Sequence, residues 1–269
     1  MENPGYPPVR AAMLATGARL IPVPVDADGM RVDRVPDGVR VICVTPSHQS
    51  PTGAVMPRAR RMALLTRARE LGASIIEDDY DGEFLYDKAP QDALQMLDAD
   101  ARVFYVGTFS KSLFPTLRKG FVVAPAWARD ALIDAKYCTD SHCDLLTQVT
   151  LAAFISEGHL ARHIRRMRPI YTRRRAALAD TIGEHLSPWL EVLPGPAGLH
   201  LTARIRDSAN AADVENAALR HLPGALTLAP YTVGKLPMKG LCIGYGCAEV
   251  DQITHAVRDM GRLLRRSAN

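Results

Sequence analysis

Residues 102–113 read RVFYVGTFSKSL, an apolar run that ends on a glycine, two hydroxyl residues and a lysine, namely Gly107, Thr108, Ser110 and Lys111. A nearly continuous apolar run is typical of a strand that is buried on both faces of a parallel sheet. In open sheets of this kind, ligands bind beyond the carboxyl ends of the strands. We therefore predict a central strand that delivers Lys111 to a ligand-binding edge.

The neighbouring sequence alternates strand-like and helical stretches. Further strands are predicted at 19–26, 39–46, 73–80 and 119–125. A helix is predicted to begin at Pro57 and to stop at Gly72, with a buried face formed by Met62, Leu65 and Ala68. Strand and helix alternation predicts an α/β fold with a mainly parallel sheet and helices on both faces.

We predict three parts along the chain. Residues 1–126 form part of a large ligand-binding domain, residues 127–187 form helices between the domains, and residues 188–269 form a small C-terminal α+β domain. The last part contains the strand-like phrases LEVLPGPAGLHLTARI, ALTLAP and GLCIGYG, followed by a helix from Val250 to Arg266.

Bulk composition excludes several classes of protein. The 269-residue chain has a net charge of only +4, which gives little support to nucleic-acid binding. No apolar run approaches the roughly 20 residues that cross a bilayer, and the first residues lack the pattern of a signal peptide. We predict a cytoplasmic protein with no membrane association.

The cysteines could suggest a metal site, and one basic segment could suggest nucleic-acid binding, but we favour neither function. Five cysteines suit reduced thiols, and the spacing of Cys138, His142 and Cys143 matches no common zinc pattern, so no metal is predicted. Residues 161–178 hold seven arginines, which would suit a nucleic-acid patch. We instead predict an amphipathic helix kinked at Pro169, with its arginines in solvent and a buried stripe of Ile164, Met167, Tyr171 and Leu178.

Three predicted strands end in polar groups that would meet at one edge: TPSHQSPTG (45–53), EDDYDGEF (77–84) and GTFSKSL (107–113). A lysine desolvated at this edge is a candidate nucleophile for a Schiff base. Asp78 could keep the ring nitrogen of an aromatic cofactor protonated, and Tyr80, on the same side of the strand, could donate to a ring oxygen.

A phosphate group would suit the remaining donors, Thr108, Ser110 and Arg118. Taken singly, each residue has a structural alternative. Asp78 could cap a helix, Lys111 could be a surface charge, and Arg118 could pair with an acid. Their joint placement at strand ends favours a site.

At this point the phrases ENPGYP, VTPSHQSPTG, IIEDDYDGEF and GTFSKSLFPTLRKGFVVAP resemble a known family. They are similar to the aminotransferase-like domain of MocR-type transcription regulators of the GntR superfamily, which are fold type I pyridoxal-phosphate proteins. The resemblance covers essentially the whole chain. It implies pyridoxal 5'-phosphate as cofactor, a small-molecule amine or amino acid as ligand, and a homodimer.

The resemblance also implies roles for individual residues. Lys111 is similar to the lysine that forms the Schiff base, Asp78 to the partner of the pyridine nitrogen, and Tyr80 to the donor to the phenolic oxygen. Arg118, together with Thr108 or Ser110, resembles the phosphate anchor. The tyrosine of the PGY phrase, Tyr6, is a candidate neighbour of the cofactor ring.

Three departures from the family pattern qualify these expectations. The chain begins at ENPGYP, whereas family chains open with a winged helix-turn-helix and the first part of the large domain, so we expect an N-terminally truncated chain. Ser50 stands where related aminotransferases often place an asparagine that bonds the ring oxygen. Cys242 stands about where they place an arginine for the substrate carboxylate, and the nearest cation is Lys239.

Three functions therefore stay open. The first is an aminotransferase that moves an amino group between an amino acid and a 2-oxo acid. The second is a regulator's effector domain that senses an amine by Schiff-base exchange, without turnover. The third is a truncated chain that neither binds the cofactor nor acts. We expect no DNA binding by this chain alone, because it contains no helix-turn-helix pattern.

Overall fold

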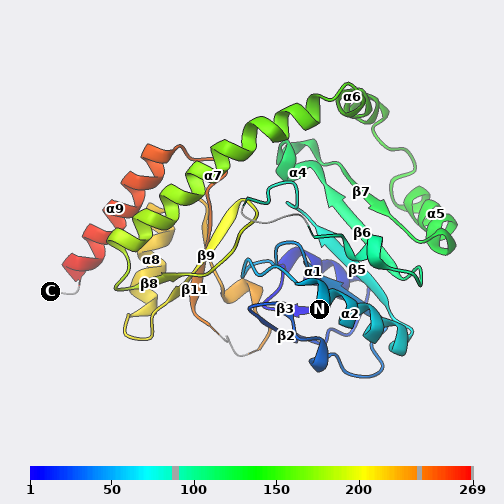
Figure 1. The fold of residues 1–269 in the computed structure, drawn as a ribbon, viewed down its shortest axis with the longest axis horizontal. Helices are drawn as coiled ribbons and strands as arrows, with labels where there is room; N and C mark the ends of the chain where they lie inside the picture. The colour runs from blue at the N-terminus through cyan, green and yellow to red at the C-terminus, as the bar shows by residue number, and fades with distance from the viewer. Residues whose placement is uncertain (87–90, 235–237, 268–269) are drawn as a thin grey trace.

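The computed structural model describes residues 1–86, 91–234 and 238–267. Its first half is built around a four-stranded sheet, with smaller elements before it (Figure 1). In chain order, the elements of this half are β1 (Glu2–Asn3), α1 (Pro7–Ala15), β2 (Val23–Asp26), β3 (Gly29–Met30), η1 (Val32–Arg34), β4 (Val41–Val44), α2 (Arg58–Leu71), β5 (Ser74–Asp79), α3 (Leu94–Leu97), β6 (Val103–Thr108), α4 (Phe109–Ser112), η2 (Pro115–Leu117) and β7 (Gly120–Val123).

The second half begins with helices and ends in an antiparallel sheet. Its elements are η3 (Ala126–Ala128), α5 (Arg129–Asp140), α6 (Leu145–Ser156), α7 (His159–His185), β8 (Leu190–Val192), β9 (His200–Ile205), α8 (Ala211–His221), β10 (Ala225–Thr227), η4 (Ala229–Tyr231), β11 (Gly240–Gly244) and α9 (Val250–Ser267). Figure 1 shows α7 running from α6, on the side of β7, to α9, on the side of the β8–β11 sheet.

The main sheet has the order β4-β5-β6-β7, and β4, β5 and β6 are parallel, as predicted. Two predicted strands differ from the expectation. The strand at 19–26 lies in a separate small sheet, as β2, beside β1 and β3. β7 is antiparallel to β6 and all four of its residues are exposed, because a short connection returns the chain along β6 at the sheet edge.

Helix α2 begins and ends close to the predicted points. Pro57 is its N-cap, and Gly72 ends it in the left-handed conformation with φ 64°. The buried face contains Leu65 and Ala68, as predicted, but Met62 is 43% exposed. The three predicted residues are spaced by three positions, whereas a helix has 3.6 residues per turn, so this spacing drifts away from the buried face. Arg61 is therefore buried in place of Met62.

Two apolar cores hold the molecule together. One packs α2 against the main sheet and β2, with Ile42, Leu64 and Ile75 at its centre. The other packs α7, α8 and α9 against the sheet of order β10-β11-β9-β8. Phe84, which follows β5, belongs to this second core and contacts Tyr171 edge-on at 5.0 Å between ring centroids. The segment after β5 therefore ties the two halves together.

The arginine-rich segment forms most of α7, which continues through Pro169. Tyr171 and Leu178 are buried, and Ile164 and Met167 pack against the second core, so the predicted stripe is correct. The prediction that the arginines lie in solvent is wrong for Arg174, which is buried against Gly246 and Glu249. Across the described residues, no helix is long and apolar enough to cross a membrane.

Candidate functional site

The three acidic residues at the end of β5 point to opposite faces of the sheet, because side chains alternate along a strand. Glu77 accepts hydrogen bonds from the backbone N–H groups of Leu94 (2.9 Å) and Gln95 (3.0 Å), and Asp79 accepts one from the Tyr105 hydroxyl at 2.7 Å. These two carboxylates therefore already accept hydrogen bonds from groups within the protein. Asp78 lies on the other face.

Asp78 lines a narrow recess together with Tyr6 and Thr45. Burial, together with the nearby charges of Asp79 and Asp81, raises the pKa of the Asp78 carboxyl to about 6. The structure thus brings Tyr6 and Asp78 together at the carboxyl end of the sheet. A cationic partner in this recess would favour the ionised carboxylate.

Tyr80 continues the same face and is held by the loop after β4. Its hydroxyl donates to the backbone oxygen of His48 at 2.9 Å and lies 3.0 Å from His48 Nδ1. The Ser50 side chain lies close enough to this hydroxyl to act on its pKa. Burial raises the pKa of the Tyr80 phenol well above its usual range, so the hydroxyl keeps its proton at neutral pH.

Lys111 lies on the short helix α4 at the end of β6, next to the predicted hydroxyls. Thr108 caps this helix: its Oγ1 accepts from the Ser110 N–H and lies 3.1 Å from the Ser110 hydroxyl. Lys111 is exposed, so the described residues do not provide the predicted desolvation. Among these residues, no hydrogen bond or ion pair engages its amino group.

Gly107 lets the chain pass under an aromatic side chain just before Lys111. A Cβ at this position would lie 2.3 Å from Phe121 Cζ on β7, so no larger residue fits without movement. The Phe121 ring in turn lies 5.7 Å from that of Phe109 on α4. This packing fixes the turn that carries Thr108, Ser110 and Lys111.

Arg118 follows the helical turn η2, close in the chain to the strand β7 that pairs with Thr108. It ends η2 in the left-handed conformation, with φ 49°, and lines a recess of about 660 Å³ with Lys119, Lys136 and His142. Among the described residues, no hydrogen bond joins Arg118 to Thr108 or Ser110. Its predicted role in phosphate binding therefore stays a prediction.

The second half contributes polar groups that face Lys111. Burial is the main cause of the pKa shifts of two of these groups, His200 and Cys242, and the positive charge of Lys111 is a minor one. Burial is the larger cause for His200, whose pKa falls to about 3, so its imidazole is neutral. Burial also raises the pKa of the Cys242 thiol to about 11, and this thiol hydrogen-bonds with Tyr231.

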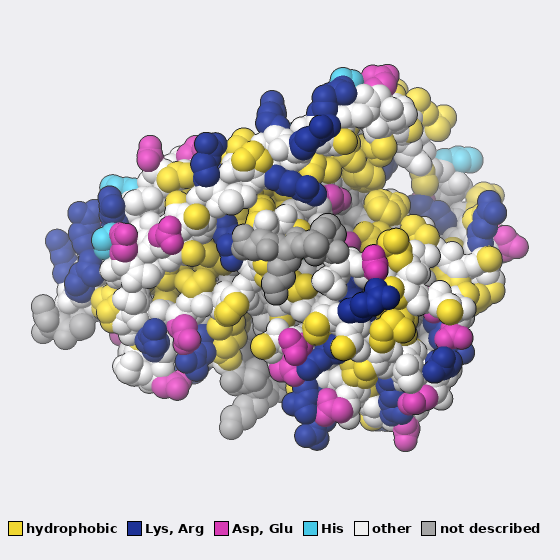
Figure 2. Space-filling view, in the orientation of Figure 1, with side chains coloured by type: hydrophobic (Ala, Val, Ile, Leu, Met, Phe, Trp, Pro, Cys, Tyr) yellow, Lys and Arg dark blue, Asp and Glu magenta, His cyan; other side chains and the backbone are white. Residues whose placement is uncertain are grey.

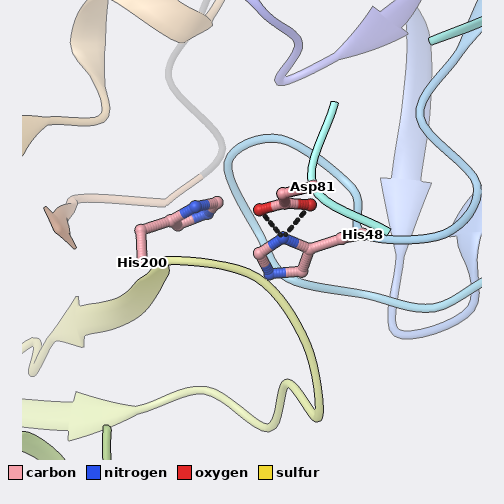
Figure 3. Close-up of side chains that lie close together, drawn as sticks. All are labelled: His48, Asp81 and His200. Atoms are coloured by element: carbon pink, nitrogen blue, oxygen red, sulfur yellow. Dashed lines mark hydrogen bonds and ion pairs between the residues drawn. The ribbon is translucent and has the colours of Figure 1, made fainter. Parts of the chain in front are cut away.

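His48, Asp81 and His200 form a cluster that the sequence analysis missed (Figure 3). His48 Nδ1 lies 3.2 Å and 3.0 Å from the two Asp81 oxygens, and His200 Nε2 lies 3.1 Å from the Pro51 carbonyl. Potential metal-ligand atoms of the three residues all lie within 4.8 Å of one another. A metal ion would have to displace these partners, so we interpret the group as a hydrogen-bonded His48–Asp81 pair with His200 packed beside it.

Comparison with known proteins identifies the family of the chain. The model of the family "Aminotransferase class I and II" matches residues 1–222. The chain belongs to this family. As a class I and II aminotransferase-family chain it is also similar to the probable rhizopine catabolism regulatory protein MocR of Rhizobium meliloti, with 42% identity over 205 residues. That match covers 76% of this chain and 42% of the regulator, and the chain spans about half the length of the curated relatives it matches.

Solved structures of aminotransferases share the fold. The Pyrococcus horikoshii kynurenine aminotransferase matches with a TM-score of 0.90 and 24% identity, over 100% of this chain and 69% of that one. LysN, an alpha-aminoadipate aminotransferase of Thermus thermophilus, matches with a TM-score of 0.86 and 26% identity, over 98% of this chain and 70% of that one. The predicted fold type I architecture and the predicted similarity to MocR-type regulators are both confirmed.

The LysN structure contains N-(5'-phosphopyridoxyl)-L-leucine, and the family implies pyridoxal phosphate as cofactor, as predicted. The donor set of this chain fits that group. It offers an amine without a partner among the described residues, a buried carboxyl, a phenol that keeps its proton, and two hydroxyls on one turn, in Lys111, Asp78, Tyr80, Thr108 and Ser110.

Proposed function

We propose that the chain provides a pyridoxal-phosphate site in which Lys111 holds the cofactor aldehyde. The observation that supports this most directly is the convergence of two neighbouring strand ends. Asp79 pairs with Gly107 in the parallel ladder, so the turns that carry Tyr80 and Lys111 leave the sheet side by side. When bound, the cofactor supplies an electron sink for chemistry at an amine.

Different residues of the chain would bind different parts of the cofactor. Asp78 would accept from the protonated ring nitrogen, Tyr80 would turn its hydroxyl proton from the His48 carbonyl to the ring oxygen, and the Thr108 and Ser110 hydroxyls would donate to the phosphate. Arg118 adds charge to the phosphate side. Tyr6, which lines the same recess as Asp78, would lie beside the ring, and Ser50 would act on it through Tyr80.

We propose that the longer protein uses this site to sense an amine or amino acid, as an effector domain of a transcription regulator. Similarity to the MocR regulator supports this role. So does Cys242, a buried neutral thiol about where aminotransferases place a carboxylate-binding arginine. Aminotransfer is the second candidate, and the family match over residues 1–222 favours it.

A homodimer is part of the proposal. Large apolar side chains are exposed on β7, α5 and α6, and these gather at one end of the molecule, at the upper right of Figure 2. Leu145 and Leu146 are 71% and 79% exposed, and Val149 is 59% exposed. Contiguous apolar surface of this kind is typical of an interaction face.

Borohydride reduction tests the site. Purified protein incubated with pyridoxal phosphate, reduced and digested should carry the label on the peptide that contains Lys111. Lys111→Ala should abolish the label. Lys119→Ala is the matched control, because Lys119 lies in the same connection between β6 and β7 but pairs with Asp144 at 3.6 Å. No label, or a label on another lysine in the wild-type protein, would refute the site.

A turnover assay separates the two candidate functions. Protein loaded with pyridoxal phosphate and not reduced is mixed with an amino acid and a 2-oxo acid, and the products are followed over many equivalents of protein. Multiple turnovers would establish an aminotransferase and exclude a purely sensory role. A change in the cofactor's visible band on adding amine, with no product beyond one equivalent, would support the sensor.

A further inference from the structure

The Asp81–His48 pair lies directly behind Tyr80, and neither residue has a role in the proposed function. His48 follows β4 and Asp81 follows β5, and both side chains are only 2% exposed. We propose that His48 and Asp81 are positioning residues for the Tyr80 hydroxyl. This inference rests on the proposed function, in which that hydroxyl donates to the cofactor.

The hydrogen-bond geometry fixes the tautomer of His48. A carboxylate beside Nδ1 keeps the proton on that nitrogen. The resulting Nδ1–H lies between Asp81, at 3.0 Å, and the Tyr80 hydroxyl oxygen, at 3.0 Å. A phenol has one proton and two acceptor lone pairs, so the Nδ1–H, shared with Asp81, engages one lone pair of the Tyr80 oxygen while the phenol proton is donated to the His48 carbonyl oxygen.

The backbone of His48 holds the same hydroxyl a second time. Its carbonyl oxygen lies 2.9 Å from the Tyr80 hydroxyl. The side chain and the main chain of His48 therefore flank one oxygen atom, which restricts where the Tyr80 ring can lie. Asp81 acts one step further back, because it orients the imidazole.

The second half of the chain closes over this pair at Gly198. A Cβ at Gly198 would lie 2.0 Å from His48 Cε1 and 2.5 Å from Asp81 Oδ2, and φ is +81°. The N–H of Leu199 donates to Asp81 at 3.3 Å, and the Tyr86 hydroxyl donates to the Gly198 carbonyl at 2.7 Å. The loop before β9 thus keeps water from the pair, and the position of Tyr80 depends on that loop.

A matched pair of His48 variants tests the proposal in cofactor-free protein. Asparagine places an amide near the Nδ1 position, whereas glutamine places it near Nε2. Protein labelled with ¹³C at the tyrosine ζ carbon reports on Tyr80, whose resonance is identified by its loss in Tyr80→Phe. His48→Asn should keep the wild-type resonance and His48→Gln should move it. An unmoved resonance in His48→Gln would overturn the proposal.

Cofactor binding gives a second readout. His48→Gln should weaken pyridoxal-phosphate binding about tenfold in the wild-type background, as for one lost hydrogen bond. In the Tyr80→Phe background it should weaken binding less than about twofold, because His48 acts through the missing hydroxyl. An equal loss in both backgrounds would overturn the proposal. If the wild-type protein binds no cofactor, the proposed function fails, and the Tyr80 resonance alone decides the positioning role.

Gly198→Ala tests the contribution of the loop before β9. It should move the Tyr80 resonance. Gly17→Ala should not, although Gly17 has a similar φ of +77°, because nothing lies within 4 Å of its Cβ position. A folded Gly198→Ala protein with an unmoved resonance would refute the coupling to this loop. If Gly198→Ala does not fold, the His48 variants still decide whether the pair positions Tyr80.

Discussion

At the scale of single residues, Asp78 is a carboxyl group whose environment opposes its ionisation. It is largely buried beside two further acidic residues, and its pKa is raised to about 6. An unfolded chain gives aspartate a pKa of about 4. The folded chain therefore binds more protons than the unfolded chain between about pH 4 and pH 6, and its free energy of unfolding falls as the pH rises through that range.

Asp78→Asn should remove this cost without changing the shape of the side chain. At pH 8 it should raise the free energy of unfolding of the cofactor-free protein by about 2–3 kcal/mol, and at pH 4 it should change it little. Urea unfolding at both pH values measures the difference. Asp180→Asn, on the exposed face of α7, is the control and should have no effect. Equal effects of Asp78→Asn at the two pH values would contradict the argument.

The sequence indicates which residues share a face, but not which distant residues meet. Asp78 and Tyr80 are two positions apart on a strand, so their common face follows from the strand period. His48 and Asp81 are 33 residues apart, and Gly198 lies more than 100 residues beyond both. The EDDYDGEF phrase contains Asp81, but no local sequence pattern predicts that Asp81 contacts His48.

At the scale of elements, one charged residue of α7, Arg174, connects this helix to neighbouring elements. Arg174 donates to the Gly246 carbonyl at 2.7 Å, pairs with Glu249, and lies 5.8 Å from the centre of the Tyr171 ring. These contacts join the helix to the end of β11 and the start of α9. The neighbouring Arg173 is exposed. The two arginines therefore differ in environment although they are adjacent in sequence.

Arg174→Ala should lower the free energy of unfolding by about 2 kcal/mol, because it leaves the Gly246 carbonyl without its donor and removes the packing of a buried side chain against Tyr171. Arg173→Ala should change it by less than about 0.5 kcal/mol. Chemical denaturation followed by circular dichroism compares the two variants. Equal effects would show that Arg174 behaves as an ordinary surface charge.

Element positions were predictable where a local signal set them. Pro57 and Gly72 bound α2 because a proline suits the start of a helix and a glycine suits a left-handed end. The direction and exposure of β7 were not predictable in this way. Its sequence, GFVV, reads as a buried strand, but its place at the sheet edge leaves Phe121, Val122 and Val123 each more than 40% exposed.

At the scale of the whole molecule, the two cores meet along a seam between loops. The strip from Leu193 to His200 contacts the loop after β4 through Pro51 and the segment after β5 through Tyr86. Tyr86 N–H donates to the Pro196 carbonyl at 2.9 Å, and Leu85 bridges to Ala197. The cluster behind Tyr80 lies in this seam, so the candidate site draws on both halves of the chain.

The apolar end of the molecule leads to the last prediction. Self-association through α6 should bury Leu146, which is 79% exposed. Leu146→Glu should therefore weaken association at least tenfold, because it places a charge in an apolar contact, while the urea midpoint of the fold stays unchanged. Sedimentation velocity over a range of concentrations measures the association. Leu219→Glu, at a 54% exposed site on α8, is the control and should associate like the wild type. A wild-type protein that stays monomeric, or two variants that behave alike, would show that this face does not join two copies.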